Sequence, residues 1–136
     1  MRKIMIGFAA ALAAVSSFAV PAGAANVPAA GIWRNPKNTV HVKLQPCGGT
    51  MCGTVVWAAP KAQAKAQAAG QRLVGVQLFR EFKPAGPNMW KGRVFVPNMN
   101  RTFAGTMTAT APNRITGRGC LIGGFFCKEQ TWVRIG

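Results

Sequence analysis

The sequence predicts an all-β fold, a small antiparallel barrel of about eight strands with a short helix or loop insert, following a cleaved signal peptide. Three observations support this fold class. Short segments alternate apolar and polar residues, which is the pattern of a half-buried strand. Gly, Pro and Asn separate these segments, without intervening long helices. Several strands also contain an internal glycine, which suits the bends that a closed barrel requires.

The expected strands run from residue 31 nearly to the end of the chain. In VHVKLQ, three aliphatic residues alternate with three polar ones, the period of two that is typical of a strand with one buried face. Turns are expected at KPAGPN (83–88) and PNMN (97–100). In chain order, the expected strands are GIWR (31–34), VHVKLQ (40–45), CGTVVWA (52–58), RLVGVQLF (72–79), MWKGRVFV (89–96), RTFAGTMTA (101–109), NRITGRG (113–119) and EQTWVRI (129–135).

One segment departs from the strand pattern. PKAQAKAQAAG (60–70) has only strong helix formers between a proline and a glycine. It contains no large apolar residue, so we do not expect it to bury a face. The segment is therefore predicted to be a short surface helix or a mobile loop, and a solvated connector is favoured over a functional lid.

The first 24 residues are typical of a signal peptide. Arg2 and Lys3 precede an apolar run from Ile4 to Val20, and Ala22-Gly23-Ala24 provides the small residues of a cleavage site. An uncleaved membrane anchor is the alternative, but the apolar run is at the short end for a membrane span. We therefore predict a signal peptide at residues 1–24 and a single barrel domain at 25–136. The protein is expected to be periplasmic or secreted, with no transmembrane span after cleavage.

The four cysteines fit disulfide bonds better than a metal site or a redox pair. They are Cys47, Cys52, Cys120 and Cys127, and an even number in an exported chain usually indicates disulfides. Zinc sites favour about two to four residues between paired cysteines, and the second pair exceeds this. Neither pair has the spacing of a redox motif. Three pairings remain open, and local pairing of Cys47 with Cys52 and of Cys120 with Cys127 is preferred because each spacing suits a tight loop.

Charge and composition exclude several kinds of chemistry. The formal net charge is +15, and loss of Arg2 and Lys3 would lower it to about +13. After residue 24 the chain has no Asp, Ser or Tyr and a single His, so a Ser-His-Asp triad, an Asp pair or a carboxylate cluster for a hard cation is excluded. His41 is expected to be solvated and Glu129 to pair with Lys128. We therefore expect no catalytic residues, no metal and no cofactor.

Four stretches carry a resemblance to a known family: GIWRNPKNTVHVKLQPCGGTMCGTVVW (31–57), MWKGRVFVP (89–97), TFAGTM (102–107) and RGCLIGGFFCKEQTWVRI (118–135). Together they resemble a bacterial exported family known as domain of unknown function 2147. The resemblance covers nearly all of residues 31–136. It implies a small lipocalin-like, calycin-type barrel and no established activity.

Two residues are expected to close one end of such a barrel. A Gly-x-Trp that opens the first strand, with an Arg on the last strand, recurs in lipocalin-like folds. Trp33 would therefore plug one end of the barrel, and Arg134 would lie over its ring. The resulting cation–π contact is worth about 0.5–2 kcal/mol.

Two kinds of function remain open. An eight-stranded barrel is either filled by side chains or holds one small ligand, which here would be apolar or amphiphilic. The aromatic residues that could line such a pocket are Trp57, Trp90, Phe95, Phe103, Phe125, Phe126 and Trp132. Alternatively, the positive charge attracts an anionic envelope surface, such as lipid head groups, polysaccharide or nucleic acid. The cations are scattered and no RNA-binding aromatic motif accompanies them, so no specific nucleic acid recognition is expected.

Overall fold

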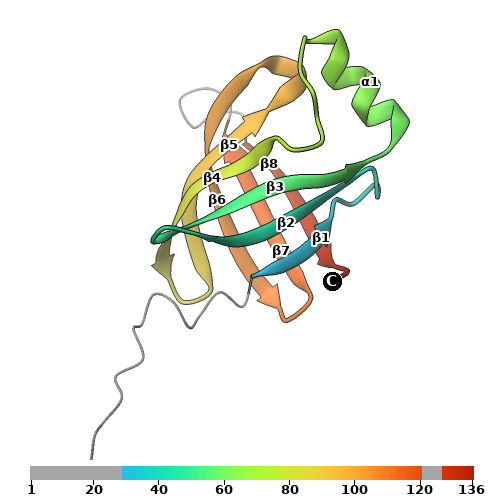
Figure 1. Ribbon diagram of the computed structural model, residues 1–136. Helices are drawn as coiled ribbons and strands as arrows, with labels where there is room; N and C mark the ends of the chain where they lie inside the picture. The colour runs from blue at the N-terminus through green and yellow to red at the C-terminus, as the bar shows by residue number, and fades with distance from the viewer. Residues whose placement is uncertain (1–28, 121–126) are drawn as a thin grey trace, which may run out of the picture.

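The computed structural model describes residues 29–120 and 127–136, so the predicted signal peptide, Phe125 and Phe126 lie outside the described residues. Within these ranges the chain forms a closed antiparallel barrel of eight strands, with one short α-helix (Figure 1). Each strand pairs with the next, and β8 returns to pair with β1. The predicted fold class is confirmed. The strands are β1 (Gly31–Arg34), β2 (Val40–Cys47), β3 (Thr50–Ala58), β4 (Gln77–Gly86), β5 (Met89–Val96), β6 (Arg101–Ala111), β7 (Arg114–Cys120) and β8 (Cys127–Arg134).

Alternating side chains place the core inside the barrel. In β2, Val42 and Leu44 are buried, whereas Lys43 and Gln45 are exposed. This follows from strand geometry, because successive side chains point to opposite faces of the sheet. No charged side chain is buried in the part of the chain that the structure describes. The apolar residues of the strands therefore fill the interior, and the charges remain on the outer surface or at the rims.

Strand β4 differs from its predicted limits at both ends. The sequence pattern predicted a strand at 72–79 and a turn at 83–88, but β4 spans Gln77–Gly86. It begins late because Gly75 adopts a left-handed φ of 93°, which interrupts the extended backbone. It extends to Gly86, within the expected turn at 83–88, because it pairs with β5, and the turn itself is confined to residues 87–88. Pairing with a neighbouring strand outweighs the local turn signal.

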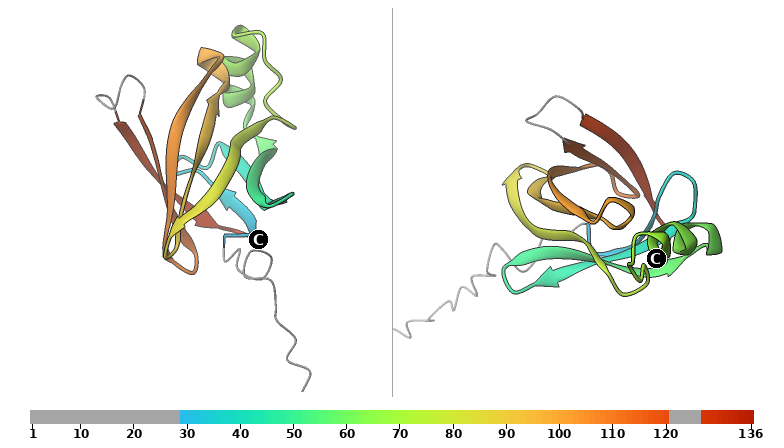
Figure 2. Two further views of the ribbon diagram at one scale, coloured as in Figure 1. Left: turned by 90° about the vertical axis from the view of Figure 1, so that its left-hand side faces the viewer. Right: turned by 90° about the horizontal axis from the view of Figure 1, so that it is seen from above.

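Helix α1 (Pro60–Ala68) confirms the helical alternative for its segment, and one of its residues is buried. Ala66 is 2% exposed and belongs to the same core cluster as Leu73. Only alanine side chains of the helix pack against the core, which agrees with the absence of a large apolar residue in this segment. The helix contacts the short 3-10 helix η1 (Pro97–Met99) at one end of the barrel, which we call the helix end (Figure 2). Among the described residues, no helix is long and apolar enough to cross a membrane.

The opposite end of the barrel is closed by Trp33, and we call it the Trp33 end. The indole is 1% exposed, and its Nε1 donates a hydrogen bond to the carbonyl of Ala29 at 2.8 Å. Trp33 pairs with Arg134 across the β1–β8 junction, and the guanidinium carbon lies 4.5 Å from the centroid of the ring. The contact expected between these two residues is present in the structure.

Both predicted disulfides form. Cys47 and Cys52 are joined across the β2–β3 hairpin, with their Cα atoms 5.8 Å apart. Cys120 and Cys127 join the end of β7 to the start of β8, with Cα atoms 4.0 Å apart. The local pairing is thereby confirmed, and no described cysteine remains free to bind zinc or act as a redox thiol.

Candidate functional site

The middle of the barrel and its Trp33 end are filled with side chains. Two strand glycines make room there for aromatic rings. A Cβ added at Gly53 would lie 2.6 Å from Cδ2 of Phe79, and one added at Gly92 would lie 2.7 Å from the ring of Phe82. The two rings also meet edge to face, with centroids 5.9 Å apart. Neither position has room for a further side-chain atom, so the rings of Phe79 and Phe82 fill the space beside these two glycines.

Toward the helix end the interior is hollow. A Cβ added at Gly117 or Gly119 would lie at least 3.9 Å from every atom outside the two residues adjacent in sequence. Both glycines line a cavity of about 360 Å³, which is bordered mainly by β4 to β8 and by η1. Ligand pockets have volumes of about 300–1,000 Å³, so this cavity has the size needed for one small molecule.

The walls of the cavity are mainly apolar and aromatic. Phe103 on β6 and Trp132 on β8 border it, and Phe79 and Phe82 border it from the packed middle of the barrel. The rings of Phe79 and Trp132 meet edge to face, with centroids 5.5 Å apart and planes at 78°. Such aromatic pairs add about 0.5–1.5 kcal/mol beyond the burial of their area. The cavity therefore has a rigid apolar base that suits a hydrocarbon chain or ring.

Two polar side chains of β8 stand on the cavity face. Lys128 pairs with Gly119 in the β7–β8 register. Gln130 pairs with Gly117, and the register between the two strands is unbroken. Because side chains alternate, Lys128 and Gln130 share the strand face of Trp132, whose ring is buried. Both border the cavity, and the glycines opposite them leave the space in front of them open.

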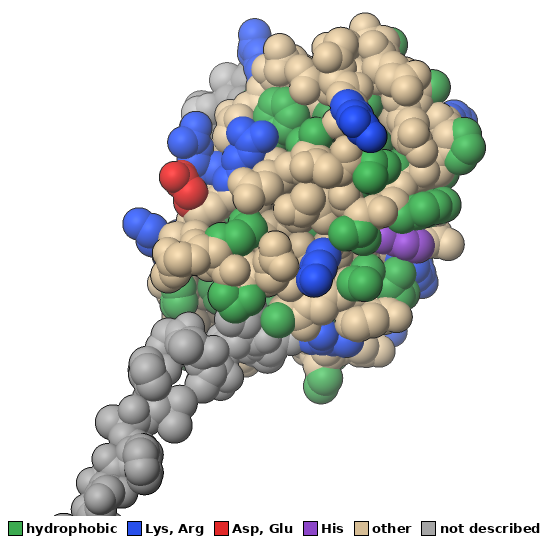
Figure 3. All heavy atoms as spheres, in the orientation of Figure 1, with side chains coloured by type: hydrophobic (Ala, Val, Ile, Leu, Met, Phe, Trp, Pro, Cys, Tyr) green, Lys and Arg blue, Asp and Glu red, His purple; other side chains and the backbone are tan. Residues whose placement is uncertain are grey.

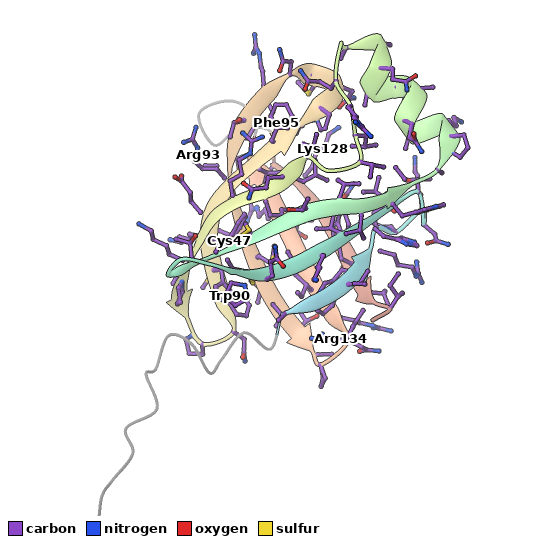
Figure 4. The ribbon with its side chains drawn as sticks, viewed as in Figure 1. Cys47, Trp90, Arg93, Phe95, Lys128 and Arg134 are labelled. Carbon is purple, nitrogen blue, oxygen red and sulfur yellow. A yellow bond between two sulfur atoms is a disulfide. The ribbon has the colours of Figure 1, made fainter. Side chains whose placement is uncertain are left out.

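The labelled side chains in Figure 4 show how the two ends of the barrel differ. Lys128 and Phe95 lie toward the helix end, whereas Trp90 and Arg134 lie toward the opposite end. The helix end therefore combines the hollow interior with a cationic side chain, and the Trp33 end contains the sealed core.

Of the seven aromatic residues predicted as possible ligand contacts, the structure describes five, and it brings three of these together at the cavity. Phe103 and Trp132 border the cavity on inward-facing positions. Phe95 also borders it, but its ring lies under the guanidinium of Arg80, with the guanidinium carbon 4.6 Å from the centroid. Phe95 is therefore available at the edge of the cavity, partly covered by a cation.

The other two aromatic candidates lie elsewhere. Trp90 is 5% exposed and packs in the core, in register with Met107, so it does not border the cavity. Trp57 is 42% exposed, and its ring lies 4.4 Å from that of His41 on the outside of the barrel. A register shift next to His41 adds one residue, Val56, to β3, and this bulge breaks the alternation that would otherwise place Trp57 on the same face as the buried Val55.

Several residues that border the cavity were not predicted from the sequence. Phe79 and Phe82 were assigned to the end of one strand and to the region before a turn, so they were not recognised as facing inward. Lys128 and Gln130 were overlooked because the expectation considered only aromatic residues. Counting back from Trp132 in steps of two would have placed both of them on the inner face.

Of the ionisable residues that could serve in acid–base catalysis, His41, Glu81 and Glu129 do not border the cavity. Nε2 of His41 lies 2.7 Å from Oδ1 of Asn38 on the exposed surface. Glu81 forms an ion pair with Arg93 at 3.7 Å, and about two thirds of each side chain is exposed. The pair expected between Glu129 and its neighbour Lys128 is not formed among the described residues, because adjacent strand residues point to opposite faces.

Comparisons with known proteins agree with this architecture. The model of a family described as "Uncharacterized protein conserved in bacteria (DUF2147)" matches residues 31–134, which confirms the resemblance seen in the sequence. A solved structure of a Helicobacter pylori protein, HP1028, described as belonging to the lipocalin family, is similar in fold. Its TM-score is 0.57 at 12% sequence identity, over 79% of this chain and 82% of that one. The comparison with curated proteins gives no match.

Proposed function

We propose that this chain, which belongs to the family of uncharacterized bacterial proteins DUF2147, is a non-catalytic binding module for one small apolar or amphiphilic molecule. The observation that carries the proposal is the contrast within the barrel. Its core is sealed at the Trp33 end, and a cavity of about 360 Å³ with aromatic walls lies toward the helix end. A cavity of this size can hold water in the free protein, and an apolar ligand that displaces this water gains contact with the aromatic walls.

The chemistry of the walls indicates the class of ligand. Apolar atoms that enter the cavity leave water, which contributes about 0.8 kcal/mol for each buried CH₂ group. The residues considered for acid–base chemistry lie on the outer surface, which supports binding over catalysis. The two disulfides support a location in an oxidising compartment such as the periplasm.

The test is to fill the cavity without disturbing the core. Gly117→Val adds a side chain where a Cβ would come no closer than 3.9 Å to the carbonyl oxygen of Gln130. The barrel should therefore fold normally, and the volume available to a ligand should decrease. Thr108→Val on β6 is the matched control, because Thr108 lies on the opposite strand face from the buried Met107. The uncharged fluorescent probe N-phenylnaphthylamine should bind the wild type and the control saturably, and Gly117→Val should weaken this binding at least tenfold. Equal binding by all three proteins would place the probe outside the cavity and contradict the proposal.

A second candidate function rests on the surface charge. None of the Lys and Arg side chains among the described residues is buried, and Figure 3 shows them spread over one face with little acidic surface. A surface of this kind attracts anionic envelope components over long range. Binding to vesicles that contain phosphatidylglycerol should weaken as salt rises, because exposed charges are screened beyond about 10 Å at 0.1 M. Binding that does not respond to salt would exclude this function.

A further inference from the structure

We propose that the cavity selects single-chain amphiphiles with an anionic head group, with Lys128 and Gln130 binding the head while the chain enters the apolar interior. The inference rests on the proposed binding function and names the ligand class of the same cavity. Its basis is the order of side chains along β8, the distribution of charge around the cavity, and the hydrogen-bonding groups at its rim.

The inner face of β8 changes from polar to apolar along the strand. Lys128 is exposed at its start, Gln130 follows, and Trp132 is 8% exposed. At a rise of about 3.3 Å per residue, the Cα atoms of Lys128 and Trp132 lie about 13 Å apart. A ligand aligned with β8 therefore meets a cation at the rim and an aromatic ring at the base, which matches the polarity of an amphiphile.

The charge around the cavity is positive, because Lys128 borders it on the inner face of β8 and Arg118 borders it from β7. The chain contains only two acidic side chains, Glu81 and Glu129. Glu81 lies on the outer surface with Arg93. Glu129 is in register with Arg118 and occupies the strand face opposite to that of Lys128. Within the described residues, no carboxylate therefore faces the cavity to neutralise Lys128. An entering anion gains a favourable charge interaction, and an entering cation is repelled.

The hydrogen-bonding groups distinguish head groups further. The ammonium of Lys128 has three donors and no acceptor, and the amide of Gln130 adds two donors. A carboxylate or phosphate has only acceptors to offer, so it can accept from both side chains, and bonds to a charged partner are stronger than neutral ones. An alcohol with the same chain makes only weaker bonds, and an amine places a second cation beside Lys128.

The test compares ligands that differ only in their head groups. Decanoate, decanol and decylamine share one chain length, and decyl phosphate separates a phosphate head from that of a fatty acid. Each competes with bound N-phenylnaphthylamine at neutral pH. We expect decanoate or decyl phosphate to bind roughly three- to tenfold more tightly than decanol. This difference in affinity is the size expected for a partly exposed hydrogen bond to a charged group. Decylamine should bind most weakly. The difference in affinity between the anion and decanol should decrease as the salt concentration rises.

Substitution assigns this preference to one side chain. In Lys128→Met the advantage of the anion over decanol should disappear, while the affinity for decanol should remain. Lys128→Gln is a second neutral variant, in case the first folds poorly. Lys91→Met is the matched control, because Lys91 is an exposed lysine on β5 next to the inward-facing Trp90, and it should keep the preference.

The outcomes separate the inference from the proposed function. An unchanged preference for anions in both Lys128 variants, or an equal loss of anion and alcohol binding, would overturn the role of Lys128. Binding of decanol and anions with equal affinity to the wild type would overturn the anion selectivity and leave the binding function intact. Failure of every probe to bind the wild type would overturn both.

Discussion

Removal of the Trp33 side chain is expected to lower the free energy of unfolding by about 3–5 kcal/mol, the range for truncation of a buried Trp. The structure supports the upper part of this range, because the ring is 1% exposed and its Nε1 donates to the carbonyl of Ala29 at 2.8 Å. Trp33→Ala leaves a cavity at the Trp33 end and an unpaired carbonyl. Trp33→Phe keeps an aromatic ring and loses the hydrogen bond, so it should be less destabilising than Trp33→Ala.

Arg134 should be energetically coupled to Trp33. Its guanidinium carbon lies 4.5 Å from the ring centroid, and its Nε donates to the carbonyl of Pro112 at 3.1 Å. It also donates from Nη1 to the carbonyl of Ala30. Arg134→Ala removes all of these contacts, so its effect alone does not isolate the cation–π term. A double-mutant cycle does so and should give a coupling energy of about 0.5–2 kcal/mol.

The assay is urea denaturation of the wild type, the two single variants and the double variant. Unfolding should be followed by far-ultraviolet circular dichroism, because Trp33→Ala itself alters the tryptophan fluorescence. Losses that add to within about 0.3 kcal/mol would show that the two side chains are not coupled. A loss below about 1 kcal/mol for Trp33→Ala would contradict the conclusion that its ring closes the barrel.

Three further predictions concern packing, disulfides and processing. Gly53→Ala should destabilise the barrel by about 1–3 kcal/mol, because its Cβ would lie 2.6 Å from the ring of Phe79. Gly117→Ala should change the stability by no more than about 0.5 kcal/mol. Equal effects of the two variants in thermal denaturation would contradict the contrast between the packed and the hollow region. Reduction of the two short-range disulfides should lower the free energy of unfolding by about 2 kcal/mol each, and identical urea midpoints with and without reductant would argue against this stabilisation. Protein recovered from the cell envelope should begin at Ala25 by intact mass, and a chain that retains Met1 would refute the predicted cleavage.

The sequence located the strands of the barrel, apart from the limits of β4, and its family motifs indicated which residues close one end. Alternation depends only on the two-residue period of a strand, so β5 was predicted at the same residues that it occupies, Met89–Val96. For the disulfides, the close spacing of the cysteines favoured local pairing, and the structure decided among the three possible pairings. Family motifs placed Trp33 and Arg134 on strands that become neighbours when the barrel closes.

Tertiary structure decided where alternation fails. Trp57 follows an apolar strand pattern, but the bulge beside His41 turns it to the outer surface. A bulge depends on the register between two paired strands, and this register cannot be inferred from the sequence of either strand alone. For the same reason β4 extends through a segment rich in Pro and Gly, because its hydrogen bonds to β5 outweigh the local preference for a turn.

Tertiary structure also decided which part of the interior is hollow. Alternation indicates that a glycine faces inward, but it does not indicate what occupies the space beside it. Gly53 faces the ring of Phe79, which comes from a different strand, so that space is filled. Gly117 and Gly119 face no such ring, and the cavity lies there, beside the cation of Lys128. Packing is a property of side chains brought together from distant parts of the sequence, and only the closed barrel specifies which of them meet.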